Sequence, residues 1–200
     1  DTLRWIDTFE IDTVFYDVGA SNGLFGIYAA VARHARVVAF EPEIQNVAVV
    51  EMNHFLNRQS ISTPIMALNL ALGAATSVGA MSCQSYTPGA HGKVLGSIGM
   101  RGQAPGVQLA HQQPVLVESL DAVVERYGLP APHHLKIDVD GAELDVLEGA
   151  QETVRSPQLE SLLIESDADG AIPGSISTQL EDAGLALAAV HEIREIIGTP

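Results

Sequence analysis

The chain has 200 residues, of which 46% are hydrophobic and 18% charged, so it can bury the core of one domain of ordinary size. Its formal net charge is −15 with only 10 Lys and Arg residues, which argues against nucleic acid and anionic membranes as partners. Its apolar runs are far shorter than the roughly 18 residues that a membrane-spanning helix needs, which argues against membrane insertion. The single cysteine, Cys83, excludes an intrachain disulfide and favours a reducing, cytoplasmic location.

Strand and helix patterns alternate along the chain. The elements predicted for the first part are a short helix or turn over 3–9, a strand over 13–18, a helix over 23–34, a strand over 36–40, a helix over 43–57 and one or two strands over 61–72. The second part predicts a strand over 115–120, a helix from a cap at Ser119 or Asp121 to Tyr127, a strand over 134–139, a helix over 143–154, a strand over 159–165, a helix over 175–183 closed by Gly184, and the last strand or strands over 185–197.

The pattern dissolves between residues 80 and 113, where six glycines and two prolines recur. This composition predicts a long loop, and a loop of such length in a compact domain is usually functional. No internal repeat or hinge divides the chain, so we expect a single domain over 1–200.

Alternating strands and helices predict parallel β-α-β units, and therefore an α/β fold with a doubly wound, mostly parallel sheet. Ligands of such sheets bind outside the carboxyl ends of the strands. Four predicted strands end in an acid at that edge, namely Asp17, Glu41, Asp138 and Glu165. We therefore expect the binding site at this edge of the sheet.

The turn after the first strand predicts a nucleotide-type cofactor site. Its glycines, Gly19 and Gly23, let the backbone turn sharply, although they could also serve packing alone. Ala20 and Ser21 stand where G-x-G-x-x-G has its second early glycine, so a pyrophosphate cradle is disfavoured. The preceding acid suits a cationic group such as the amino group of methionine, which favours S-adenosylmethionine as cofactor. The residues predicted to contact it here are Asp17, Gly19, Ala20, Ser21, Asn22 and Gly23.

Glu41 stands at the end of the second predicted strand, one strand–helix–strand step after Asp17. An acid in this place can accept hydrogen bonds from both hydroxyls of a ribose. Pro42 fixes the turn that follows. Glu41 and Pro42 are therefore predicted to bind the ribose of the cofactor, the alternative being a solvated acid at a strand end.

A third block of polar residues surrounds the strand over 134–139. Alternation places Lys136, Asp138 and Asp140 on one side of this strand. Asp140 and Glu143 have the spacing of a capping box for the next helix. Asp138, Asp140 and Glu165 could also hold a hard cation such as Mg²⁺, but nothing in their spacing demands a metal.

Residues 16–23, 39–43 and 135–143, together with 146–150, resemble the FkbM family of methyltransferases in their order and spacing. The similarity runs from about residue 3 to residue 165, and the third block is its most specific part. Asp140 departs from the family pattern, which usually has Glu there, and residues 73–75 lack the acid that many relatives carry.

The resemblance implies a class I methyltransferase fold with seven strands, the last one antiparallel, and S-adenosylmethionine as cofactor. It implies that Asp17, Gly19 and Gly23 surround the methionine part, that Glu41 binds the ribose, and that Asn69 lies beside the adenine. It also implies O-methylation of a hydroxyl on a sugar or another small molecule.

Transfer of a methyl group to a hydroxyl benefits from a base that removes the proton. Asp138 is the first candidate for both cofactor contact and catalysis, Glu165 is the second candidate base, and Lys136 or a loop histidine is a further one. The loop over 80–113 is expected to cover a glycan or small-molecule acceptor. Two rival interpretations stay open: a nicotinamide-dependent oxidoreductase, and a non-catalytic partner subunit that keeps the cofactor pocket. A homo-oligomer is compatible with the sequence.

Overall fold

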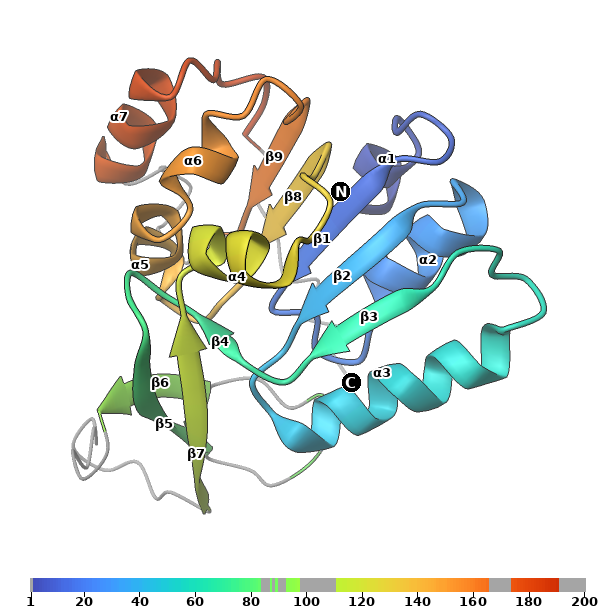
Figure 1. Ribbon diagram of the computed structural model, residues 1–200, viewed down its shortest axis with the longest axis horizontal. Helices are drawn as coiled ribbons and strands as arrows, with labels where there is room; N and C mark the ends of the chain where they lie inside the picture. Colours follow the sequence, from blue (N-terminus) through green and yellow to red (C-terminus); the bar gives the residue numbers. More distant parts are fainter. Residues whose placement is uncertain are drawn as a thin grey trace, which may run out of the picture.

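The protein is described by a computed structural model in which nine strands form two sheets within the described residues (Figure 1). The main sheet has five parallel strands in the order β3-β2-β1-β8-β9, and the second sheet has four in the order β4-β7-β5-β6. The described residues are 2–83, 87, 89, 93–97, 111–165 and 174–190.

Strands and helices alternate along most of the chain as predicted, but the described residues from 71 to 118 contain strands and no helix. The strands are β1 (Val14–Val18), β2 (Arg36–Phe40), β3 (Ile65–Leu68), β4 (Ala71–Leu72), β5 (Ser77–Cys83), β6 (Lys93–Ser97), β7 (His111–Glu118), β8 (His134–Ile137) and β9 (Ser161–Ile164). The helices are α1 (Thr2–Ile6), α2 (Leu24–Ala32), α3 (Ile44–Asn57), α4 (Leu120–Tyr127), α5 (Glu143–Glu148), α6 (Gln151–Val154) and α7 (Gly174–Asp182). None of these helices in the described ranges is long and apolar enough to cross a bilayer.

Helices cover both faces of the main sheet, with α1, α2 and α3 on one side and α4 to α7 on the other (Figure 1). Side chains alternate between the faces along each strand. In β1, Phe15 belongs to the core under α1 and α2, whereas Tyr16 and Val18 belong to the core under α4 to α7. This is the doubly wound α/β arrangement that the alternation of elements predicts.

Most predicted boundaries of the elements agree with the structure, including the cap at Ser119, whose hydroxyl accepts the N–H of Ala122 at 3.3 Å. One helix is an exception. The helix predicted over 143–154 is broken into α5 and α6. The break lies at Gly149, which packs so closely against the carbonyl of Gly73 that a Cβ there would collide with it. Contact with the second sheet therefore accompanies the interruption of the helical pattern.

The structure differs from three expectations. Instead of seven strands in one sheet, the described residues form five strands in the main sheet and four in the second. The prediction of a loop over 80–113 is wrong in three places. Residues 80–83 belong to β5, residues 93–97 form β6, and residues 111–113 belong to β7. Residues 185–190 form no strand, and the rest of the predicted last strand, 191–197, lies outside the described residues.

A buried histidine joins three elements at the amino-terminal edge of the main sheet. His134 is only 4% exposed and stacks on Phe9 with ring centroids 3.6 Å apart. Its Nδ1 lies 2.8 Å from the hydroxyl of Ser161, which also accepts the indole N–H of Trp5 at 3.0 Å. Burial and the neighbouring His133 lower the pKa of His134 to about 4.

This lowered pKa makes the stability of the fold depend on pH. Between pH 4 and pH 6.5 the unfolded chain binds a proton at His134 that the folded chain does not, so stability rises with pH. We expect the free energy of unfolding to lose on the order of 2 kcal/mol from this group as pH falls from 6.5 towards 4. Chemical denaturation at several pH values checks this, with H134Q as the comparison. An equal loss in wild type and H134Q contradicts the assignment to His134.

Candidate functional site

The carboxyl ends of β1, β2 and β8 meet in one set of backbone hydrogen bonds. The N–H groups of Gly19 and Ala20 both donate to the carbonyl of Phe40 at the end of β2, at 2.9 and 3.2 Å. The N–H of Asp138 donates to the carbonyl of Val18, at 3.1 Å. The turn after β1 is therefore held between its two neighbouring strand ends.

This turn has three left-handed residues within five positions. Gly19, Ser21 and Gly23 have φ values of 76°, 50° and 81°. For a residue with a side chain, such as Ser21, the left-handed conformation costs roughly 1 kcal/mol, so it needs a compensating contact. A Cβ on Gly19 would collide with the carbonyl of Asp138, and a Cβ on Gly23 would press against Val50 of α3.

Glu41 supplies that compensating contact at the end of β2. Its Oε2 accepts the N–H of Ser21 at 2.7 Å, and its Oε1 accepts the N–H of Glu43 at 2.8 Å. The side chain is buried, with 5% of Glu41 exposed. A carboxylate has room for roughly four hydrogen bonds. Glu41 thus shapes the turn after β1 with both of its carboxylate oxygens.

Asp17 lies differently from the expected position. It is 0% exposed, and its Oδ1 is 3.4 Å from the Nζ of Lys136, its partner residue in the register of β1 and β8. Burial raises the pKa of Asp17, and the ammonium of Lys136 opposes that rise. Asp17 therefore lies beneath the turn, within the sheet, rather than on a surface that a ligand could touch.

Lys136 also reaches Asp138, the candidate base at the end of β8. Its Nζ donates to Oδ2 of Asp138 at 2.8 Å, and the side chain of Asp138 remains 36% exposed. Burial lowers the pKa of Lys136, but the carboxylates of Asp17 and Asp138 outweigh it and hold that pKa above its usual value. Asp138 is the accessible end of this buried group.

The turn after Glu41 is held by side chains from other elements. Asn69 donates its amide N–H groups to the carbonyls of Glu41 and Pro42, at 3.1 and 2.9 Å. Gln113, at the start of β7, donates to the carbonyl of Pro42 at 2.7 Å. Asn69 thus fastens the expected ribose turn, and Gln113, which no sequence motif marks, connects the second sheet to it.

The Gly-rich segment also touches this region. The N–H of Gly89 donates to Oδ1 of Asn46 in α3, at 2.8 Å. Asn46 is buried near the start of α3, the helix that follows the Glu41–Pro42 turn. This contact brings part of the segment over 80–113 to the edge of the site.

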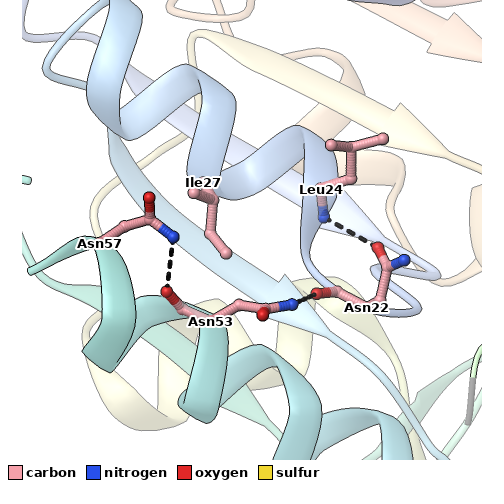
Figure 2. Close-up of a pocket in the computed structure, with 5 residues that line it drawn as sticks. All are labelled: Asn22, Leu24, Ile27, Asn53 and Asn57. Carbon is pink, nitrogen blue, oxygen red and sulfur yellow. Dashed lines mark hydrogen bonds between the residues drawn. The ribbon is translucent and has the colours of Figure 1, made fainter.

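Asn22 lines a surface hollow of about 310 Å³ between α2 and α3 (Figure 2). Its Oδ1 accepts the N–H of Leu24 at 3.1 Å, and its carbonyl accepts the amide of Asn53 at 2.9 Å. These contacts fix the start of α2. The hollow is lined by Asn22, Leu24, Ile27, Asn53 and Asn57.

Glu165 follows β9 and donates its backbone N–H to the carbonyl of Ile137, at 2.9 Å, so it stands beside the end of β8 as expected. Asp140 and Glu143 form no capping box, because Ala142 is the N-cap of α5 and Glu143 instead accepts the N–H of Gly141 at 3.2 Å. Among the described residues, no group of three or more His, Cys, Asp or Glu side chains is arranged to hold a metal ion.

Comparison with known proteins places the chain among methyltransferases. A curated relative, the hexuronic acid methyltransferase AglP of Haloferax volcanii, is 26% identical over 186 residues, which cover 92% of this chain and 69% of AglP. The solved structure of methyltransferase FkbM from Methylobacillus flagellatus KT has 19% identity and a TM-score of 0.51, over 78% of this chain and 33% of that one. This chain therefore spans about a third of that structure.

A second solved structure, an S-adenosylmethionine-dependent methyltransferase from Agrobacterium tumefaciens, has 11% identity and a TM-score of 0.50, over 91% of this chain and 47% of that one. At these identities the structural likenesses concern the fold alone. The model of the family described as "Methyltransferase FkbM domain" matches residues 17–196, which include all three strand ends of the site. This chain therefore belongs to the FkbM methyltransferase family.

Proposed function

We propose that this chain binds S-adenosylmethionine at the ends of β1, β2 and β8 and transfers its methyl group to a hydroxyl of a sugar. The observation that carries the proposal is the carboxylate of Glu41, which reaches from β2 to the left-handed turn of β1. Family membership supports methyl transfer. The name of AglP, a hexuronic acid methyltransferase, supports a sugar as the acceptor.

The residues at these strand ends fit the cofactor. Glu41 is a carboxylate, the kind of acceptor that a ribose diol takes, and the close approach at Gly19 keeps the turn free of a side chain. Asn69 fastens the turn on which the ribose and adenine would rest. Asp17 contributes from beneath, through Lys136, rather than by direct contact. When bound, S-adenosylmethionine supplies a methyl group that its sulfonium already activates.

The chain's own residues then have to place an oxygen nucleophile and accept its proton. Positioning accounts for much of the acceleration in such a reaction. Asp138 is the accessible carboxylate at the end of β8, so we assign it as the base, with Glu165 at the end of β9 as the second candidate. With the cofactor bound, Asp138 would take the proton of the acceptor hydroxyl, and the cofactor would supply the activated methyl group.

The first experiment tests binding and turnover separately. Titration calorimetry with S-adenosylhomocysteine and with NAD tests the cofactor, and release of S-adenosylhomocysteine over a panel of neutral sugars and hexuronic acids tests the transfer. Incorporation of a ¹³C-labelled methyl group, followed by NMR, distinguishes an ether from an ester product. Binding of NAD alone would favour the oxidoreductase, and cofactor binding without transfer to any acceptor would favour the non-catalytic subunit.

Replacing the proposed base is expected to slow catalysis and spare binding. In D138N we expect kcat to fall by about 100-fold or more, because the amide cannot take the proton. The Kd for S-adenosylhomocysteine should stay within about threefold of wild type, since a substitution that removes only a transition-state role leaves ground-state binding intact. The comparison is E165Q, which distinguishes the two candidates. Full turnover in D138N together with a large loss in E165Q would move the base to Glu165.

A further inference from the structure

Lys136 is the largest charged side chain among the fully buried residues of the described chain. It is 1% exposed and lies between two carboxylates, that of Asp17 at 3.4 Å and that of Asp138 at 2.8 Å. Its Nζ also stands 5.1 Å from the ring centroid of Phe25 in α2. Fixing a lysine side chain costs conformational entropy, and burying its charge adds a desolvation cost.

The ion pair with Asp17 compensates for the burial of the Lys136 charge, but it does not explain why Lys136 also contacts Asp138. Asp17 and Lys136 are direct neighbours in the β1–β8 register and would suffice to neutralise each other. Lys136 nevertheless makes its shorter contact with Asp138, two residues further along the same face. The contact engages only Oδ2, and within the described part of the chain no residue bonds to Oδ1 of Asp138.

We propose that Lys136 is a positioning residue for methyl transfer, which holds Asp138 by Oδ2 so that Oδ1 is presented to the acceptor hydroxyl. This inference rests on the proposed function of the site. Asp17 and Phe25 anchor the ammonium, and the ammonium orients the base. When Asp138 takes the acceptor proton and becomes neutral, Lys136 keeps Asp17 as its counter-charge, so no buried cation is left unpaired during the reaction.

A double-mutant cycle over Lys136 and Asp138 tests the coupling in turnover. We expect kcat to fall by about 100-fold in K136M, while K136R, whose guanidinium keeps the charge and the donors, stays within about tenfold of wild type. In the D138N background, K136M should cause little further loss, because a residue that acts through Asp138 has nothing left to position. Additive losses in the double variant would overturn the proposal.

A second pair of variants keeps the test valid if K136M leaves Asp17 too costly to bury. D17N and D17N/K136M both remove the buried negative charge, and replacing a buried ion pair by neutral residues is often tolerated. Crystal structures of these two variants can be determined whether or not the variants are active. We expect Asp138 to keep its place in D17N and to leave it in D17N/K136M. An unmoved Asp138 in D17N/K136M would overturn the proposal.

The two arms also distinguish this inference from the proposed function. If the wild-type chain methylates no acceptor, the proposed function fails, and the crystal structures alone decide whether Lys136 positions Asp138. If the wild-type chain is active and the losses of the cycle add, the function stands and the role of Lys136 falls.

Discussion

Replacement of Gly19 by alanine is expected to abolish binding of S-adenosylhomocysteine and to lower the free energy of unfolding by about 4 kcal/mol. Two effects add at this position. The backbone is left-handed, with φ 76°, and a Cβ would collide with the backbone carbonyl of Asp138. Backbone at the end of β8 cannot move aside as a flexible side chain could, because the N–H of Asp138 is bonded to the carbonyl of Val18. The strand ends of β1 and β8 must therefore separate.

Gly128 provides the matched control for this substitution. It also has a left-handed backbone, with φ 61°, at the end of α4, but nothing lies within 4 Å of the position its Cβ would take. G128A should therefore cost only about 1 kcal/mol and leave the Kd for S-adenosylhomocysteine unchanged. Calorimetry and denaturant titration of both variants measure the two quantities. Similar losses of stability in G19A and G128A would show that conformation, and not the contact with β8, makes Gly19 necessary.

The meeting of Gly19 and Glu41 at neighbouring strand ends could be predicted because the signals are local. A glycine turn after an apolar strand, and an acid at the next strand end, need only a few consecutive residues to be recognised. Parallel β-α-β topology then brings the strand ends together without knowledge of any single contact. For the same reason the order of elements from β1 to β3 agrees with the structure.

The burial of Asp17 could not be predicted from its local motif. Its place in the motif predicts ligand contact, but its burial depends on Lys136, a partner 119 residues away that only the β1–β8 register selects. The apolar residues on either side of each charge, Tyr16 and Val18 in β1 and Leu135 and Ile137 in β8, are the signal that it lies inside the sheet. A buried acid and a buried base on neighbouring strands indicate an ion pair, and this pairing was open to prediction once the strand order was inferred.

The second sheet could not be predicted for a different reason. Its strands contain Gly79, Gly96 and Pro114, which weaken a strand pattern, and they pair across long gaps in the sequence. Proline lacks an N–H, and glycine has no side chain to mark the alternation of faces. Contacts between distant segments therefore specify this sheet, and with it the position of Gln113 against Pro42.

Replacement of Glu41 is the most direct test of the cofactor site. In E41Q one carboxylate oxygen becomes an NH₂ group, yet both oxygens of Glu41 accept backbone N–H groups, from Ser21 at 2.7 Å and from Glu43 at 2.8 Å. One donor must then face another donor, which costs about 1–3 kcal/mol. The acceptor capacity for the ribose falls as well, so we expect the Kd for S-adenosylhomocysteine to rise by about 100-fold or more.

Glu118 provides the control for E41Q, because it shows what the loss of a carboxylate outside the proposed site does to binding. It also accepts two hydrogen bonds, from Thr76 at 2.6 Å and from Arg126 at 2.7 Å, but it lies in β7 and touches neither strand-end turn. E118Q should leave the affinity for S-adenosylhomocysteine unchanged. Adenosine and methionine, titrated separately, then locate the loss in E41Q: a ribose contact weakens adenosine, whereas an effect confined to the turn weakens methionine as well. Wild-type affinity of E41Q for S-adenosylhomocysteine would remove Glu41 from the site, because no arrangement of the amide preserves both N–H contacts and the ribose contact.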